Sequence, residues 1–204
     1  MLFITTDYTN VLQMRTFLAA FALFTTYTSF AACTYCTDIN EALTNPGEVE
    51  HLDLSGKGVT ALPDSLHLFV NLKSLDLSDN RIESLNFGKA ELPYLKSINL
   101  NFNPGIDMIN ITGIDKAFPV LSELHLRDCS IFLISAELGN LKELSFLDLT
   151  NNKLKTIPDA LDNCNSSELK LRNNDLNNAY WLTNLWSVSV LDISDNEKLR
   201  LDEV

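Results

Sequence analysis

The hydrophobic residues of this chain recur in one short pattern, which is clearest in the stretch LSFLDLTNNKL that begins at Leu144. Apolar residues occupy its first, fourth, sixth and eleventh positions, and asparagine its ninth. The alternation in the middle is typical of a short β-strand, because successive side chains of a strand point to opposite faces. Equivalent stretches begin at Val49, Leu72, Leu95, Leu121, Leu144, Ser166 and Val188. The steps between them are 22 to 26 residues, so the chain is predicted to be an array of structural repeats.

The recurring pattern matches LxxLxLxxN/CxL and therefore resembles the leucine-rich repeat family from Val49 to the C-terminus. This resemblance implies an α/β-type solenoid: a right-handed superhelix, or horseshoe, with a parallel concave β-sheet and a mostly irregular or 3₁₀ convex side. Two repeats also fit the LPxxLxxL form of a common bacterial type, through Leu62-Pro63, Leu66 and Phe69, and through Ile157-Pro158, Leu161 and Cys164. A fold of this kind does not identify a ligand.

An asparagine follows the strand segment in five repeats, at positions 80, 103, 152, 174 and 196. We expect its amide to be buried at the bend, where it satisfies backbone groups that would otherwise lack partners. Cys129 stands at this position in the fourth repeat, and Lys57 in the first. Cys164 replaces a leucine of the fifth repeat and is expected to be a core thiol.

The chain opens with a segment that resembles an export signal. After Met14, the basic residue Arg15 precedes an apolar run from Phe17 to Phe24, and small residues lead to Cys33. This order is typical of a secretory signal peptide, and the run is too short for a membrane span, which takes about 20 apolar residues. Residues 1–32 are therefore predicted to be a signal peptide, with Met14 as the expected start.

Cys33 has two interpretations that the sequence leaves open. Phe30-Ala31-Ala32-Cys33 resembles a bacterial lipobox, whose cysteine becomes the lipidated first residue, although Phe30 stands where an aliphatic residue is usual. Alternatively, ordinary signal peptidase cleaves nearby, and Cys33 and Cys36 form a small disulfide after export. The protein is therefore expected to be exported and either secreted or held at the cell envelope by a lipid, which would be its sole link to a membrane.

Residues 33–48 are predicted to cap the first repeat. Asp38 and Glu41 have the spacing of a capping box, Ile39 and Leu43 give a short apolar face, and Asn45-Pro46-Gly47 ends the helix. Residues 49–204 then form the leucine-rich repeat domain, with seven repeats and no clear C-terminal cap.

Two parts of the array depart from the pattern. Repeat three is longer by three residues, and its Pro104-Gly105 and Asn110–Gly113 stretches are expected to bulge out as a loop that is either a contact site or simply tolerated.

At the C-terminal end, a solenoid whose last repeat is uncovered invites association. Three explanations stay open: Trp181, Trp186 and the last residues shield this end, a partner or a second copy covers it, or the sequence is a fragment.

The outward side chains of the strands are the expected contact surface. Repeats one, two and seven carry mostly aspartate and serine there, whereas repeats three to six carry aromatic and charged residues. Phe146 is expected to be exposed among charges and arginines, a composition typical of a protein interface. The predicted partner-binding residues are Phe102, Glu123, His125, Arg127, Phe146, Asp148, Glu168, Lys170 and Arg172.

Charge and motifs narrow the range of functions. The formal net charge of −12 argues against nucleic-acid binding, which needs a basic face. The sequence has no Gly-rich phosphate loop, no nucleophile motif and no histidine with a second ligand at metal spacing, so no cofactor or metal is expected. Asp53, Asp76 and Asp148 are expected to face open solvent, where two carboxylates do not acquire the separate pKa values of an acid–base pair.

The sequence therefore favours a non-enzymatic, exported leucine-rich repeat protein that binds another protein on its concave sheet. One alternative is a structural or self-assembling component of the cell envelope, joined through its uncapped C-terminal end. The other is a fragment of a larger protein that contains leucine-rich repeats.

Overall fold

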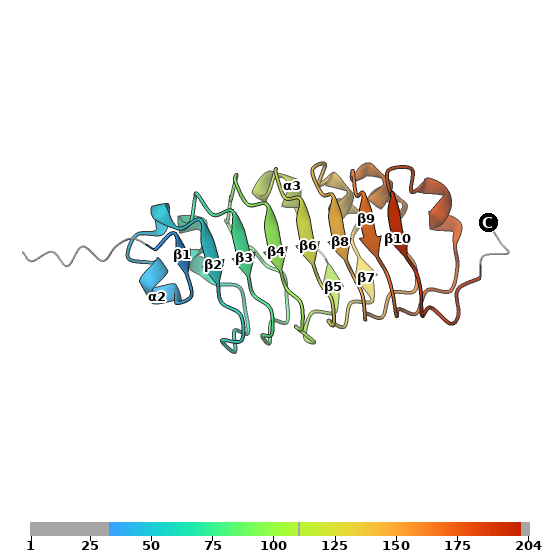
Figure 1. The fold of residues 1–204 in the computed structure, drawn as a ribbon, viewed down its shortest axis with the longest axis horizontal. Helices are drawn as coiled ribbons and strands as arrows, with labels where there is room; N and C mark the ends of the chain where they lie inside the picture. Colours follow the sequence, from blue (N-terminus) through green and yellow to red (C-terminus); the bar gives the residue numbers. More distant parts are fainter. Residues whose placement is uncertain (1–32, 110, 201–204) are drawn as a thin grey trace, which may run out of the picture. The chain divides into compact units, whose positions relative to one another are not determined.

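The computed structural model describes residues 33–109 and 111–200. Within them, one parallel sheet follows the order β1-β2-β3-β4-β6-β8-β9-β10, so that each repeat places its strand beside that of its neighbour (Figure 1). Its strands are β1 (Tyr35–Cys36), β2 (His51–Asp53), β3 (Ser74–Asp76), β4 (Ser97–Asn99), β6 (Glu123–His125), β8 (Phe146–Asp148), β9 (Glu168–Lys170) and β10 (Val190–Asp192). The seven predicted repeat strands are confirmed. The predicted signal peptide lies outside the described residues.

The middle residue of each repeat strand points into the core at a shared register. Six of these residues are 2% exposed or less, namely Leu52, Leu75, Ile98, Leu124, Leu147 and Leu169, and the seventh, Leu191, is half-buried. Neighbouring strands lie about 4.8 Å apart. Each repeat therefore buries its apolar side chains against the repeats before and after it, as a leucine-rich solenoid requires.

The asparagine that follows the strand in five repeats is buried and bonded to backbone, as predicted. Asn103 is fully buried, and its Nδ2 donates to the carbonyl oxygens of Leu77 and Leu100 at 3.0 and 2.9 Å. Its Oδ1 accepts the N–H of Ile82 at 3.0 Å. Since Leu77 and Ile82 belong to the preceding repeat, one side chain holds two repeats together. Cys129 Sγ takes this place in repeat four, 3.4 Å from the carbonyl oxygen of Leu100.

The residue immediately before this position has a left-handed backbone in all seven repeats. Its φ lies between 52° and 64° at Gly56, Asp79, Phe102, Asp128, Asn151, Asn173 and Asp195. Glycine, aspartate and asparagine tolerate this conformation, whereas it is costly for a bulky side chain. Phe102 is therefore the exception in the series.

The convex side consists of short helices, as the sequence predicts. They are η1 (Pro46–Glu48), η2 (Asp64–Leu68), η3 (Ala136–Asn140), η4 (Asp159–Asn163) and η5 (Tyr180–Asn184), all of 3₁₀ type, and the four-residue α3 (Ile114–Ala117). Pro63 and Pro158 immediately precede η2 and η4, and each helix buries a leucine, Leu66 or Leu161. The assignment of these repeats to a bacterial type stays a prediction.

The N-terminal cap contains the expected helix and an unexpected strand. Helix α2 (Ile39–Ala42) starts after Asp38, whose Oδ1 accepts the N–H groups of Asn40 and Glu41 at 2.8 and 3.1 Å. Strand β1 pairs in parallel with β2 and extends the sheet by one strand. A disulfide joins Cys33 to Cys36, and Cys36 is buried.

Repeat three is packed inward next to the two stretches predicted to bulge, of which Pro104, Gly105 and Thr112 are exposed, Ile111 is buried and Asn110 lies outside the described residues. Its residues form β5 (Met108–Ile109), which pairs with β7 (Leu133–Ile134) in a second parallel sheet, and then α3. Apolar residues spaced along it are 8% exposed or less, namely Ile106, Ile109, Ile111 and Ile114. Burial of these side chains draws the longer repeat into the core instead of leaving it as a loop.

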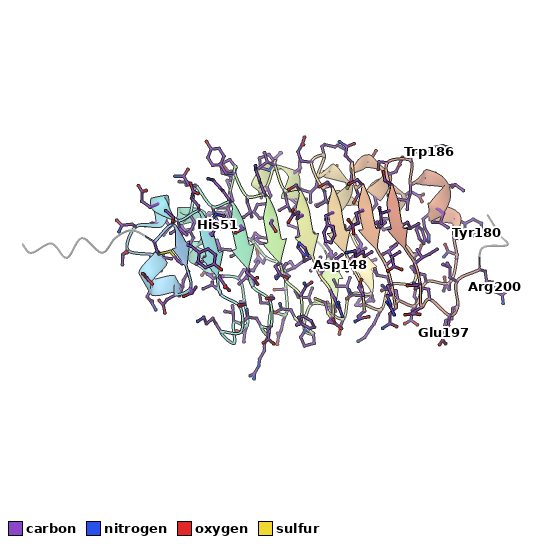
Figure 2. All side chains as sticks on the ribbon, viewed as in Figure 1. His51, Asp148, Tyr180, Trp186, Glu197 and Arg200 are labelled. Carbon is purple, nitrogen blue, oxygen red and sulfur yellow. A yellow bond between two sulfur atoms is a disulfide. The ribbon has the colours of Figure 1, made fainter. Side chains whose placement is uncertain are left out.

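Of the two tryptophans expected to shield the C-terminal end, one is buried, and the last residues, 201–204, lie outside the described residues. Trp181 is 2% exposed and donates from Nε1 to the carbonyl oxygen of Asn178 at 2.9 Å. Trp186 is 85% exposed (Figure 2), so the expectation that it covers this end is wrong. On β10, Val190 is exposed and Leu191 is half-buried, whereas the equivalent Leu169 of β9 is buried.

Candidate functional site

Strands β6, β8 and β9 gather eight of the nine predicted contact residues on the concave face. Residues at matching positions of the three strands lie side by side, in rows Glu123, Phe146, Glu168 and His125, Asp148, Lys170. A third row is Arg127, Thr150, Arg172, kept together by backbone hydrogen bonds from Asp128 to Thr150 and from Asn151 to Arg172. We call these nine residues the β6–β9 surface. The sequence does not single out Thr150, because threonine is an ordinary outward residue of a strand.

Phe146 at the centre of the first row is half-buried, which corrects the expectation that it is exposed. Its ring centroid lies 4.8 Å from that of His125 on one side. The Nζ atom of Lys170 lies 4.7 Å from the centroid on the other side. Side chains of the two neighbouring strands thus lean over the ring, and the cation–π contact with Lys170 stabilises that arrangement.

The same two basic residues also approach the carboxylates of the first row. Lys170 Nζ lies 3.1 Å from Glu168 Oε1, and His125 Nε2 lies 3.8 Å from Glu123 Oε2. These pairs are partly exposed, so each contributes little to stability. The contacts with Glu168 and with the Phe146 ring place the positive charge of Lys170 in the first row.

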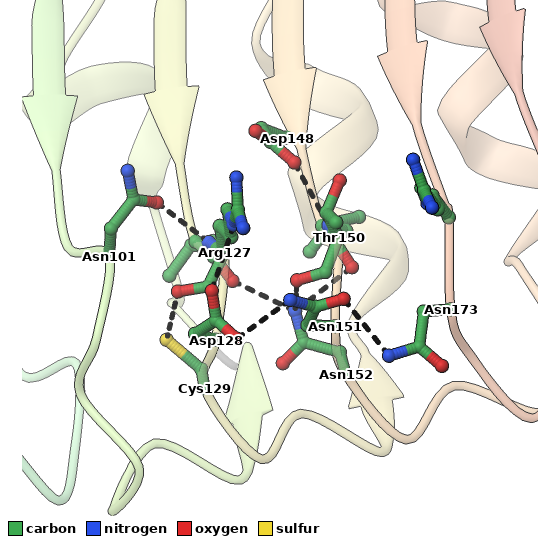
Figure 3. A network of polar contacts seen from close by, with 12 residues as sticks. Asn101, Arg127, Asp128, Cys129, Asp148, Thr150, Asn151, Asn152 and Asn173 are labelled. Atoms are coloured by element: carbon green, nitrogen blue, oxygen red, sulfur yellow. Dashed lines mark hydrogen bonds and ion pairs between the residues drawn. The ribbon is translucent and has the colours of Figure 1, made fainter.

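Asp148 occupies the centre of the surface and is 9% exposed, so the expectation that it faces open solvent is wrong. Its Oδ1 accepts the N–H of Thr150 at 2.9 Å (Figure 3). Within the described part of the chain, no group bonds to Oδ2. The burial comes from the larger side chains of His125 and Lys170, which stand beside it at the same register.

Two arginines flank Thr150 in the sheet register, and each is held by an aspartate: Arg127 by its neighbour Asp128, and Arg172 by Asp195, which follows β10 in the next repeat. Arg127 Nε donates to Asp128 Oδ2, and Arg172 Nε donates to Asp195 Oδ2, both at 2.8 Å. Thr150 between them is 7% exposed. Both guanidinium groups are about half exposed, and their Nη atoms bond to nothing else among the described residues.

A ladder of side chains fixes the turns beneath the arginines (Figure 3). Asn151 Nδ2 donates to Asp128 Oδ1 at 2.7 Å, and Asn173 Nδ2 donates to Asn151 Oδ1 at 3.0 Å. The aspartate that holds Arg127 is thus itself held by the next repeat. This support keeps the arginine end of the surface in one geometry.

Phe102, the ninth predicted residue, lies outside the grid. It sits on the turn after β4, where its N–H donates to the carbonyl oxygen of Arg127 at 2.8 Å. Its side chain is 49% exposed and its φ is +59°. An exposed aromatic ring in a strained conformation next to the arginine row extends the candidate surface along one edge.

A second hollow lies at the N-terminal end of the concave face, where β1 contributes Tyr35. It has a volume of about 140 Å³ and is lined mainly by polar residues of β1 to β4. His51 of β2, labelled in Figure 2, is one of them. The Ser55 hydroxyl and N–H donate to Asp53 Oδ1 at 2.7 and 2.9 Å and hold the pKa of Asp53 below its usual value. Asp53 therefore remains ionised here, and the sequence does not place Tyr35 beside it because its pattern does not predict β1.

The described residues show little that could perform catalysis. Across residues 33–109 and 111–200, no three histidine, cysteine or acidic side chains are grouped to hold a metal ion. Burial raises the pKa of both free thiols, Cys129 and Cys164, to about 11, so neither is a nucleophile at neutral pH. Nor does that part of the chain contain a helix of the length and hydrophobicity needed to cross a membrane.

Comparison with known families agrees with the repeat geometry. A family model described as Leucine Rich repeats (2 copies) matches residues 70–116, and a second, Leucine Rich Repeat, matches residues 143–164. These segments of the chain are leucine-rich repeats. The matched segments include β3, β4 and β8, whose inward leucines and buried asparagines carry the pattern.

This leucine-rich repeat chain resembles short parts of longer proteins. It is 31% identical over 183 residues to receptor-like protein 18 of Arabidopsis thaliana, covering 76% of the chain and 22% of that protein. It is 37% identical over 87 residues to tubulin-specific chaperone E of Xenopus laevis, covering 41% of the chain and 16% of that protein. The chain therefore spans about a fifth or less of the length of these relatives.

Solved structures share its fold at low sequence identity. A leucine-rich repeat protein of Leptospira interrogans superposes with a TM-score of 0.50 at 23% identity, covering 81% of this chain and 57% of that one. An internalin of Listeria monocytogenes gives a TM-score of 0.53 at 19% identity, covering 78% and 51%. At these identities the likeness concerns the solenoid and not the ligand.

Proposed function

We propose that this leucine-rich repeat protein is an exported, non-enzymatic binding protein that contacts a protein partner through the β6–β9 surface. The observation that carries this proposal is the half-buried Phe146, clasped between His125 and Lys170 and surrounded by charged residues. Interfaces concentrate their binding energy in aromatic and arginine residues at the centre of such a patch, with a polar rim around them. The open sheet gives a partner direct access to all three strands.

Photo-crosslinking tests the surface because it captures whichever protein lies against it. p-Benzoylphenylalanine in place of the exposed Glu123 should give a discrete crosslinked product in producing cells, whereas the same residue in place of the exposed His67, on η2 of the convex side, should not. The product should disappear when Phe146→Ser, Arg127→Gln and Arg172→Gln are combined. That variant should lower the melting temperature by about 3 °C or less, because two of its changes are at exposed positions. A product that persists in the triple variant would contradict the proposal.

Export is supported by the signal-like segment and by the Cys33–Cys36 disulfide, since disulfides persist in oxidising compartments. The disulfide also bears on anchoring, because a lipid on Cys33 would occupy the same sulfur atom. We therefore propose the secreted form over the lipid-anchored one. Mass spectrometry of the mature N-terminus should show a Cys33–Cys36 pair and no diacylglyceryl group, and a lipidated Cys33 would reverse this choice.

Self-assembly through the C-terminal end is a second candidate. It is favoured by the exposed Val190 and the half-buried Leu191 of β10, since a strand edge with partly exposed core positions invites pairing. Sedimentation of the wild-type chain should then show oligomers that grow with concentration and disappear in Val190→Glu. A monomer at every concentration would exclude this candidate.

The third alternative, a piece of a larger leucine-rich repeat protein, is supported by the small share of its relatives' length that the chain covers.

A further inference from the structure

The arginine end of the β6–β9 surface contains a site that we infer recognises a carboxylate, supplied by an aspartate or glutamate side chain of the partner. Arg127 and Arg172 would bind the carboxylate, Thr150 would donate to it from below, and Asp148 would accept a backbone N–H of the same partner segment. This inference rests on the proposed function, because it names the chemistry that the surface selects.

The floor of the site consists of two polar side chains that are more than nine-tenths buried. Asp148, the last residue of β8, is 9% exposed, and Thr150, two residues further along the chain, is 7% exposed. Among the described residues, Asp148 Oδ2 and the Thr150 hydroxyl have no hydrogen-bond partner. Both atoms still reach solvent, so water pairs with them in the free protein, and a ligand group with matching hydrogen bonds can take the place of that water. A ligand that supplies one donor and one acceptor would satisfy both of them.

The walls of the site carry positive charge with unused hydrogen-bonding capacity. Arg127 on the β6 side and Arg172 on the β9 side each engage an aspartate through Nε alone. Arginine has five N–H donors in a planar fork, and a carboxylate can accept from two of them in parallel. Asp128 and Asp195 hold the two forks in place, so little side-chain entropy remains to be lost on binding.

The combination of charges restricts the ligand further. Asp148 lies one row above Thr150 and would repel a second negative group, so an anion fits only in the arginine row. In the neighbouring row, Asp148 Oδ2 can accept a hydrogen bond, and a backbone N–H next to the acidic side chain of the partner provides the donor. An inorganic or esterified phosphate has a higher negative charge, which Asp148 would repel more strongly, and it therefore matches the site less well.

The net charge of the protein also restricts the charge of the partner. At a net charge of −12, a strongly acidic partner would be repelled during approach. The recognised carboxylate is therefore expected to stand alone in a segment that is otherwise neutral or basic. The screened range of about 8 Å at physiological ionic strength lets two nearby arginines dominate over more distant aspartates.

Selection of displayed random peptides on the immobilised full chain tests this chemistry. The selected peptides should share an aspartate or glutamate at one position, and its change to asparagine or glutamine should weaken binding at least tenfold, as expected for a charge-assisted hydrogen bond. Arg127→Gln and Arg172→Gln should each cause a similar loss with the acidic peptide and less than a twofold loss with its amide version. Lys153→Gln and Lys155→Gln, which change exposed lysines outside the surface, are the matched controls.

The outcomes separate this inference from the proposed function. Peptides that require Phe146 but share no acidic residue would overturn the carboxylate site and leave the binding surface standing. Peptides that bind Phe146→Ser and both arginine variants as well as wild type would overturn both. Displacement of the peptide by inorganic phosphate at concentrations well below those needed with acetate would also overturn the carboxylate assignment. The peptide-side substitution does not touch the fold, so its result stands even if an arginine variant is unstable.

Discussion

Lys170 on β9 places its ammonium nitrogen 4.7 Å from the centre of the Phe146 ring on β8. The contact joins two neighbouring repeats across the concave sheet, and the same nitrogen is paired with Glu168. The Phe146 ring, which could otherwise rotate on the surface of the sheet, is thereby held in one orientation.

The worth of this contact can be measured by a double-mutant cycle. Lys170→Met and Phe146→Leu should each lower the free energy of unfolding, and their coupling should be about 0.5 to 1 kcal/mol, as for cation–π pairs near a surface. Urea denaturation of the four proteins gives the coupling directly. A value near zero would mean that the two side chains are adjacent without stabilising one another.

Replacing a buried asparagine should have a much larger effect. Asn103→Ala removes the partner of two carbonyl groups and one N–H, and each orphaned buried group costs about 1 to 3 kcal/mol. We expect the free energy of unfolding to fall by about 3 kcal/mol or more. Asn140→Ala, at an exposed position that ends η3, is the control and should change it by about 0.5 kcal/mol or less. Equal losses would show that the asparagine ladder is not what joins the repeats.

Replacing Phe102 should stabilise the protein. Phe102→Asn places a residue that tolerates φ > 0 at a left-handed position, and it should raise the free energy of unfolding by about 1 kcal/mol. Phe132→Asn removes a ring of similar exposure from a position without positive φ and should give no such gain. If the first variant is also weaker in the crosslinking assay, Phe102 trades stability for binding. A destabilised Phe102→Asn would refute the strain argument.

The buried thiols predict a loss of stability at alkaline pH. Burial raises the pKa of Cys164 from 9.0 to about 11, so the folded state keeps its proton where the unfolded state has lost it. The unfolded state then binds fewer protons, and the free energy of unfolding falls as pH rises from about 9 to 11, by roughly 2 kcal/mol at most. Below pH 9 the thiol should contribute no pH dependence.

Comparison of wild type with Cys164→Ala isolates this effect from other groups that titrate in the same range. The difference in urea midpoint between the two proteins should be constant up to about pH 9 and should shrink above it. A constant difference up to pH 11 would show that Cys164 is not buried as described.

The local sequence pattern was sufficient to predict the repeats and the side chains that hold them together. The strands, the inward leucines, the buried asparagines, the 3₁₀ convex segments and the core position of Cys164 all follow from which residues recur at which step. Each depends on contacts between a repeat and its immediate neighbour, and those contacts recur in most of the repeats. The residue types and their spacing along the chain were therefore enough to predict these features.

The properties of the binding surface, by contrast, depend on which side chains three different repeats bring side by side. Phe146 is half-buried only because His125 and Lys170 lean over it, and Asp148 is enclosed only because longer side chains flank it. The strand β1 and the inward course of the repeat-three insertion likewise arise from pairing with distant segments. A linear pattern shows on which face a residue lies, but its exposure and partners are set by lateral packing, which exists only once the coils are stacked.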